Sequence, residues 1–287
     1  MSEKVSRRGY VKYAAAGVIV IAGAAAGGYY YSQRAPTVEE KVKVAYLMNE
    51  SKDDGSWCAW NVADANAIQT AFGEAVEVTT QELIEWPDME KTLRDYAEKG
   101  YKVVYGCGFQ WGEPIGRMNE DYPETQFVYT CYSTGKEPNA ASIFWREEEG
   151  GFLNGAMAGL LGATKVGIVG AMTAPCVNSF GNAVYDGLKH VGAGDVEVFN
   201  AYVGSWMDMV RGKEITEAMI EGGADYIAQD AAMTGLGIFE ACAKNKVNTM
   251  GFYRNQNDVA GIGDNCVASI LYLNFPAMKD MVDNIVA

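Results

Sequence analysis

Short apolar runs and longer amphipathic segments alternate along the chain from Lys41 to the C-terminus. The segments between the first runs carry apolar residues at helical spacing, among them Ala63–Phe72, Met89–Lys99 and Pro114–Glu120. A strand followed by an amphipathic helix, repeated, predicts an α/β fold with a doubly wound parallel sheet. The first five predicted strands are Val42–Leu47, Val76–Thr80, Val103–Gly106, Phe127–Cys131 and Ser142–Trp145.

A second series of the same kind follows a longer helical segment, Glu147–Leu161, in which Gly151, Gly155 and Gly159 predict close packing against another element. No Pro/Ser-rich linker separates the two series, so we expect two lobes joined by hinge strands around a small-molecule cleft. The N-terminal lobe is assigned to 38–146 plus 267–287, and the C-terminal lobe to 147–266. The later predicted elements are the strands Val166–Gly170, Val196–Tyr202, Tyr226–Gln229, Thr249–Phe252 and Cys266–Tyr272, then a helix at Pro276–Val286.

The turn after the first predicted strand, Ser51–Trp60, lies where open parallel sheets bind ligands. Asp54 or Ser56 can cap the following helix and leave backbone N–H groups directed at a ligand. Trp57 suits stacking on a planar ligand. The alternative interpretation is that Trp57 only covers the core beside Phe72.

The first 37 residues read as a signal or membrane anchor. Ser6–Lys12 matches the twin-arginine pattern at every position. The apolar Tyr13–Tyr31 would be about 28 Å long as a helix, which can just span a bilayer. We therefore expect an exported domain at the extracytoplasmic face of the membrane, tethered or released.

Composition narrows the function. The net charge is −14. Apart from Glu3, the charged residues among the first 35 are all basic, so the rest of the chain is more acidic than the total suggests. This acidic body argues against a nucleic-acid partner. The single histidine, His190, reads as a surface residue, and without C-x-x-C pairs no metal site or cofactor is expected. Cys107 and Cys131 end two successive predicted strands, and if those strand ends are neighbours a disulfide can join the cysteines in an oxidising compartment.

Motifs for catalysis are scarce, whereas aromatic residues gather at strand ends. The sequence contains no Walker loop and no G-x-S-x-G elbow, and a Ser-His-Asp triad would have to use His190. This inventory favours a binding protein over an enzyme. The aromatic residues are Trp57, Trp60, Trp111, Trp145, Trp206 and Tyr253.

Several segments in order resemble the basic membrane protein (Bmp) family of ABC-transporter substrate-binding proteins, which bind purine nucleosides or related purines. The resemblance begins near Lys41 and runs to the C-terminus. It implies the two-lobe periplasmic-binding-protein type I fold, a small planar ligand such as a purine base or nucleoside, and an ABC permease as partner. The matching segments are Asp54–Trp57, Glu113 with Tyr122-Pro123, Glu149–Gly155, Lys165–Gly170, Tyr202–Asp208, Gly223–Asp225 and Thr234-Gly235.

The resemblance also implies a binding site. Trp57 and Trp206 match the stacking aromatics, and Glu113, Asp230 and Asn255 are candidates for the polar edge of the ligand. Three positions depart from the family pattern, and they concern mainly the contacts to a ribose. Cys58 replaces an Asn, Tyr253 lies in Gly251–Gln256 where the family has two aspartates, and Tyr272 replaces a Lys.

Three alternatives remain open at this point. The ligand of the same kind of protein can be a sugar-like molecule. The chain can be a sensor ectodomain that serves a receptor instead of a permease. The third alternative is a nucleoside hydrolase, which would need a cluster of aspartates with a metal at the end of the first strand. Asp53-Asp54 matches such a cluster only weakly.

Overall fold

The protein is described by a computed structural model that covers residues 41–131, 138–257, 259 and 265–286. The described residues from Val42 onward form one compact unit. The twin-arginine segment Ser6–Lys12 and the apolar Tyr13–Tyr31 lie outside the described residues. Within the described part, none of the helices has the length and apolar character needed to cross a membrane.

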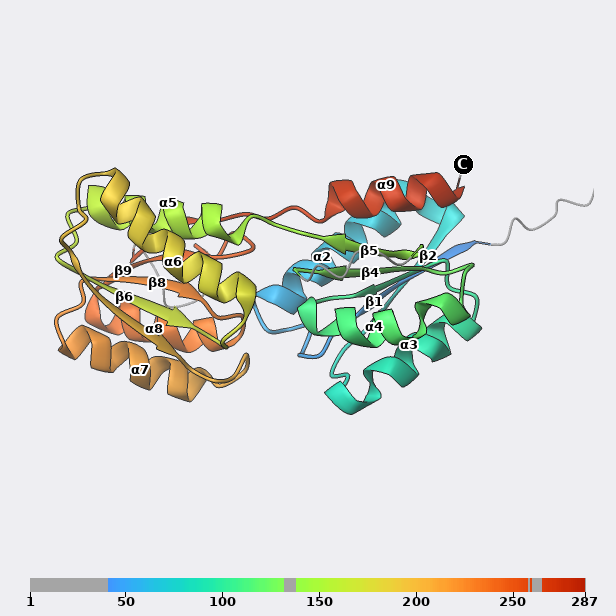
Figure 1. The fold of residues 1–287 in the computed structure, drawn as a ribbon, viewed down its shortest axis with the longest axis horizontal. Helices are drawn as coiled ribbons and strands as arrows, with labels where there is room; N and C mark the ends of the chain where they lie inside the picture. Colours follow the sequence, from blue (N-terminus) through green and yellow to red (C-terminus); the bar gives the residue numbers. More distant parts are fainter. Residues whose placement is uncertain (1–40, 132–137, 258, 260–264, 287) are drawn as a thin grey trace, which may run out of the picture. The chain divides into compact units, whose positions relative to one another are not determined.

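The N-terminal lobe is built on a five-stranded parallel sheet in the order β2-β1-β3-β4-β5. One face is covered by α2 (Trp57–Phe72) and α9 (Phe275–Val286), and the other by α3 (Met89–Glu98) and α4 (Gly112–Met118) (Figure 1). The strands are β1 (Val42–Leu47), β2 (Val76–Gln81), β3 (Val103–Gly106), β4 (Gln126–Thr130) and β5 (Ala140–Ile143). Central β1 and β3 are buried on both faces because helices cover both sides of the sheet.

The C-terminal lobe repeats this plan with the order β10-β9-β8-β6-β7, again parallel. One face carries α5 (Glu147–Leu160) and α6 (Pro175–His190), and the other α7 (Met209–Glu221) and α8 (Thr234–Asn245) (Figure 1). The strands are β6 (Lys165–Gly170), β7 (Glu197–Tyr202), β8 (Tyr226–Asp230), β9 (Asn248–Gly251) and β10 (Cys266–Ser269). The expected fold is confirmed, with strand ends shifted by a few residues.

The chain passes between the lobes twice, after β5 and after β10 (Figure 1). Because β10 pairs with β9, Cys266–Ser269 belongs to the sheet of the C-terminal lobe, a little beyond the boundary placed from the sequence. The lobes also touch directly: Gln256 Nε2 donates to the Gly55 carbonyl at 3.4 Å.

The glycines of α5 pack against α6 as their spacing predicted. A Cβ on Gly155 would lie 2.0 Å from the Val184 carbonyl oxygen, and one on Gly151 would lie 2.1 Å from that of Phe180. A glycine of α6 makes the same kind of close contact with α5, since a Cβ on Gly187 would lie 2.0 Å from the Phe152 carbonyl oxygen. The two helices therefore approach backbone to backbone, which fixes the first turn of both at the edge of the cleft.

Candidate functional site

The carboxyl ends of the two sheets meet at one cavity. In the first sheet β1 lies between β2 and β3, so the connections after β1 and β3 leave toward opposite faces; β6 and β8 have the same relationship in the second sheet. Ligands of open α/β sheets bind at such switch points. The cavity is lined from both lobes by Glu50, Trp57, Gly108, Phe109, Gln110, Thr130, Cys131, Glu147, Cys176, Trp206, Ala232 and Tyr253.

Asp54 organises the first turn. Its buried carboxylate accepts hydrogen bonds from the backbone N–H groups of Ser56, Cys58 and Ala59 at 2.8 to 2.9 Å. The Ser56 side chain makes no capping bond. The expectation that these N–H groups would face a ligand is therefore wrong, because Asp54 uses them. The same bonds start α2 at Trp57 and fix that side chain at the cavity.

Trp57 belongs to an aromatic wall that spans both lobes. Its ring centroid lies 5.4 Å from those of Trp60 and Trp145 and 4.9 Å from that of Tyr253. The Trp57 Nε1 donates to the Cys107 carbonyl at 3.0 Å. Trp206, on the loop after β7, lines the same cavity from the other lobe, and its ring lies 6.4 Å from that of Phe109. Stacking surfaces from both lobes thus border one cavity.

Tyr253 is held in an uncommon backbone conformation at φ +69°. A bulky residue in the left-handed region carries strain, which the surroundings must offset. The Tyr253 hydroxyl donates to Asp230 Oδ1 at 2.5 Å, whereas Oδ2 of that fully buried carboxyl has no partner. Burial raises the pKa of Asp230 to about 7, and the bond from Tyr253 opposes that rise.

Two acidic residues line the cavity directly. Glu50 and Glu147 are both buried, and burial is the main cause that raises the pKa of each carboxyl. The Asp230 carboxyl lies near enough to Glu147 to raise its pKa further. Among the described residues that line the cavity, none is Lys, Arg or His. Such a lining favours a ligand rich in hydrogen-bond donors and disfavours an anion.

The other residues expected from the sequence lie around the cavity instead of lining it. Cys58 is buried behind the lining, where its thiol donates to Glu50 Oε2 at 3.6 Å. Glu113 is 78% exposed and pairs with Arg117 at 3.0 Å. Asn255 is exposed and accepts from the Asn257 N–H at 3.1 Å. Tyr272 packs against Trp145 and Tyr253, with a buried hydroxyl that has no hydrogen-bond partner.

Several lining residues escaped the sequence analysis. Glu50, Phe109, Gln110 and Thr130 lie at or just after the ends of β1, β3 and β4, and Ala232 just after β8. The one feature of the sequence that these residues share is that each lies at or just after the carboxyl end of a predicted strand, and this feature could have identified them. Gln110 is fixed there by a bond from its Nε2 to Asn49 Oδ1 at 2.7 Å.

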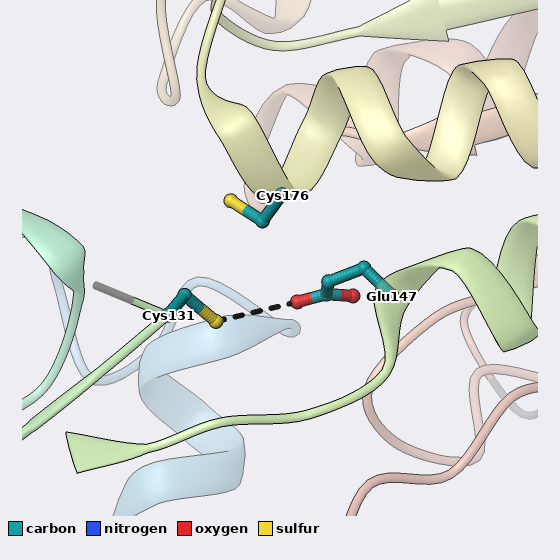
Figure 2. A group of neighbouring side chains, drawn as sticks. All are labelled: Cys131, Glu147 and Cys176. Carbon is teal, nitrogen blue, oxygen red and sulfur yellow. Dashed lines mark hydrogen bonds between the residues drawn. The ribbon is translucent and has the colours of Figure 1, made fainter. Parts of the chain in front are cut away.

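The cysteines are free thiols throughout the described part of the chain, and all six are buried. Cys107 and Cys131 do end adjacent strands, but no disulfide joins them. The Cys107 thiol turns to the Tyr105 carbonyl, and the Cys131 thiol turns to Glu147 across the cavity, as Figure 2 shows for the latter.

The cavity is small in this arrangement of the lobes. Its volume is about 40 Å³, room for roughly three water molecules at about 10–15 Å³ each. Pockets that enclose small organic ligands measure about 300–1,000 Å³. Aromatic side chains already fill most of the space, so a ligand of nucleoside size enters only when the lobes separate or these side chains move.

Relatives with assigned roles resemble parts of the chain. A nucleoside-binding protein of an ABC transporter, BmpA from Lactococcus lactis, is 31% identical over 150 residues, which cover 52% of this chain and 42% of the relative. A purine-binding protein from Brucella abortus is 26% identical over 70% of this chain and 57% of its own length. The transcriptional activator protein Med from Bacillus subtilis is 25% identical over 84% of this chain and 73% of its own. The chain thus spans less than half the length of the nucleoside-binding relative.

A structural comparison supports the fold, and a family model identifies the family. A solute-binding protein of an ABC transporter system from Aeropyrum pernix superposes with a TM-score of 0.76, at 23% identity, over 85% of this chain and 71% of its own. That likeness shows the two-lobe fold alone. The family model for Bmp, the PnrA-like ABC transporter substrate-binding proteins, matches residues 41–272. Since this match covers both lobes and the cavity between them, the chain belongs to the Bmp family of substrate-binding proteins.

Proposed function

We propose that the protein captures a purine base or nucleoside outside the cytoplasm and delivers it to an ABC permease. The observation that carries the proposal is the pairing of Trp57 and Trp206, from different lobes, around one cavity without a basic lining residue among those described. A planar, neutral, donor-rich ligand meets all of these features. The names of the Lactococcus and Brucella relatives agree with such a ligand.

Stacking supplies the affinity in this proposal. A base held against an aromatic side chain gains about 1–3 kcal/mol per face. Trp57 is fixed in direction by its bond to the Cys107 carbonyl, so part of the ordering cost is met before the ligand arrives. Trp206 follows when the lobes close by a hinge motion.

Carboxylate oxygens define the polar edge. Glu50 and Glu147 offer buried acceptors to ring N–H and exocyclic amino groups, and Gln110 adds a neutral amide. The positions that the family resemblance assigns to ribose contacts carry Tyr253 and Tyr272 here. The two tyrosine hydroxyls stand in place of a carboxylate and an ammonium group. Because these charged partners of a ribose are absent, a free base is as good a candidate as a nucleoside. Glu113 and Asn255 are exposed and do not line the cavity, so they contact the ligand only if a motion of the lobes brings them to it.

The proposal is tested by identifying the ligand and measuring its binding. Mass spectrometry of small molecules released from the purified, denatured protein names what co-purifies. Calorimetry with adenine, guanine, their nucleosides, inosine and glucose then ranks them. We expect a purine among the released molecules and binding of at least one purine with quenched tryptophan fluorescence. Glucose as the only binder would overturn the purine assignment.

Two further parts of the proposal have their own tests. Nucleosides incubated with the protein should be returned intact, and release of free base above a control without protein would indicate a hydrolase. Replacing Arg7 and Arg8 by Lys should retain the protein inside the cell. Export of that double mutant would disprove the twin-arginine route.

The similarity to the Bacillus activator supports a second candidate, a ligand-binding sensor. Its ligand site would be the same cavity, and only the partner would differ. Cross-linking in membranes separates the two functions, because a transport protein contacts a permease and a sensor contacts a receptor.

A further inference from the structure

Cys131, Glu147 and Cys176 come together at the boundary of the two lobes, although they are far apart in the sequence. Figure 2 shows the three side chains converging from the end of β4, the start of α5 and the start of α6. Their ligand atoms all lie within 4.8 Å of one another, and the Cys131 thiol lies 3.5 Å from Glu147 Oε1. Cys131 belongs to the N-terminal lobe and Cys176 to the C-terminal lobe. All three line the cavity.

The spacing suits a small tetrahedral ion. Zinc binds thiolate sulfur at about 2.3 Å and carboxylate oxygen at about 2.0–2.2 Å. At tetrahedral angles these bonds separate neighbouring ligand atoms by about 3.6–3.8 Å. The observed distances come within about 1 Å of that range, which side-chain rotation can supply. Two sulfurs and one carboxylate are also the donor types that zinc prefers over calcium or magnesium.

The carboxyl group of Glu147 carries the second, independent indication of a bound cation. Glu147 is 2% exposed, and its Oε2 has no hydrogen-bond partner. The Tyr272 hydroxyl interacts with this carboxyl, but it does not meet the geometry of a hydrogen bond to Oε2. An unpaired oxygen of a buried carboxyl is destabilising, and a bound cation would supply the missing partner.

The surroundings add negative potential without a compensating side chain. Asp230 is fully buried and leaves Oδ2 unpaired, and it contributes to the raised pKa of Glu147. Cys176 and Glu147 both lie in the first turn of long helices, where the partial positive charge stabilises anionic ligands. Both helix termini thus interact favourably with metal-bound thiolate and carboxylate ligands.

We propose that Cys131, Glu147 and Cys176 bind a thiophilic divalent cation, with zinc as the best fit, and that the ion joins the two lobes across the cavity. The three protein ligands leave a fourth position facing the cavity for water or for an atom of a bound molecule. Because the two cysteines come from different lobes, the complete site exists only when the lobes are closed. The ion therefore stabilises the closed arrangement.

The test uses the full chain, reduced with a phosphine and stripped of metal with a chelator. Zinc is then added and competed with a chromophoric chelator, and bound zinc is counted by mass spectrometry after dialysis. We expect one zinc per chain. Cobalt in place of zinc should show a thiolate-to-cobalt charge-transfer band and the intense visible bands of tetrahedral coordination. Purine ligands are left out, so the result does not depend on the proposed function.

Variants assign the site to its residues. Cys131→Ser, Cys176→Ser and Glu147→Gln should each weaken zinc binding at least tenfold, since even the loss of an outer-sphere partner costs about 10–100-fold. The matched control is Cys242→Ala, a buried cysteine outside the cluster, which should leave the affinity unchanged. Zinc should raise the melting temperature of the wild type and of the control but not of the three variants.

Two outcomes would overturn the proposal. One is the absence of a thiolate-to-cobalt band in the reduced wild type, a result that does not require any variant to fold. The other is full zinc affinity in folded Cys131→Ser and Cys176→Ser, which would place the ion elsewhere.

Discussion

The Tyr253 hydroxyl is the only hydrogen-bond donor found for the buried carboxyl of Asp230 among the described residues, at 2.5 Å from Oδ1. It joins the loop after β9 to the end of β8. The bond thereby holds an aromatic ring of the cavity wall whose backbone lies at φ +69°. The geometry of the wall depends on this pair.

Tyr253→Phe should therefore destabilise the protein by about 1–3 kcal/mol, because Asp230 is left without any partner. The matched control is Tyr272→Phe. The Tyr272 hydroxyl is also buried, beside Glu147, but makes no hydrogen bond of standard geometry, so its removal should cost less stability than the removal of the Tyr253 hydroxyl. Urea unfolding of both variants measures the difference. Equal losses would mean that ring packing, not the hydrogen bond, holds the loop.

Close packing of α5 on α6 leads to a second expectation. Gly155→Ala places a Cβ at 2.0 Å from the Val184 oxygen, so the helices must separate, at a cost of about 3 kcal/mol or more. Gly181→Ala, also within α6, meets only Ile168 Cγ2 at 3.7 Å and Asn200 Nδ2 at 3.9 Å. That control should be neutral or gain up to about 1 kcal/mol from helix propensity. Thermal unfolding decides, and a stable Gly155→Ala variant would show that the interface can adjust.

Most of this fold could be predicted from the sequence, because each strand and helix of a doubly wound sheet repeats the same pattern of buried apolar residues. The runs Val42–Leu47 and Val103–Gly106 lie in the sheet within the predicted bounds, since both are apolar on two faces. The start of α2 was predicted six residues too late. Apolar spacing reveals the covered face of a helix, whereas this helix begins where the Asp54 carboxylate accepts its first N–H groups.

The site was less accessible to sequence reasoning. Trp57, Trp206 and Tyr253, named from the sequence as aromatics near strand ends, line the cavity, whereas Trp111, named for the same reason, is buried in the core. Glu147 and Cys176 were missed as cavity residues, because an acid in a helix start and a lone cysteine are common features. Only the pairing of two lobes brings them together, and that long-range arrangement leaves no local pattern in the sequence.

Asp64 should make stability depend on pH. Burial raises the pKa of its carboxyl from 3.8 to about 6, partly opposed by the bond from the Tyr46 hydroxyl at 2.6 Å. Between those two values the folded state holds the proton and the unfolded state does not. Raising the pH therefore destabilises the fold, and the contribution present below pH 3.8 is lost as the pH rises through about 6.

Asp64→Asn removes this dependence while keeping an acceptor for Tyr46. The stability of the wild type relative to the variant should fall by up to about 3 kcal/mol between about pH 4 and pH 7. Urea unfolding at a series of pH values follows this difference, with Asp53→Asn as an exposed control. A difference that stays constant with pH would show that Asp64 titrates alike in both states.

The acidic lining of the cavity should make the protein bind nucleosides more tightly than nucleotides. Glu50 and Glu147 line the cavity, and no basic side chain is present among its described lining residues. In the metal-free protein a phosphate would be buried beside acidic groups without a basic partner, so adenosine monophosphate should bind at least tenfold more weakly than adenosine, or by about 1.4 kcal/mol. Glu50→Gln should reduce the difference in affinity between adenosine and adenosine monophosphate. Equal affinities in calorimetry would place the phosphate outside the cavity.

The two tryptophans should differ in what their removal costs. Trp57 contacts Trp60, Trp145 and Tyr253 and donates to the Cys107 carbonyl, so Trp57→Ala should lose about 2 kcal/mol of stability, roughly half the cost for a fully buried aromatic. Trp206 has one ring neighbour at 6.4 Å, and Trp206→Ala should lose less than about 1 kcal/mol.

Ligand affinity should respond differently from stability. If both rings stack on the ligand, each alanine variant loses about 1–3 kcal/mol of binding, or roughly five- to 150-fold. Trp57→Phe keeps a stacking face but gives up the bond to Cys107, so it should recover most of the affinity and only part of the stability. Calorimetry and thermal unfolding on the same four proteins separate the two roles. A folded Trp206→Ala that binds the purine normally would remove Trp206 from the clamp and leave stacking to the N-terminal lobe alone.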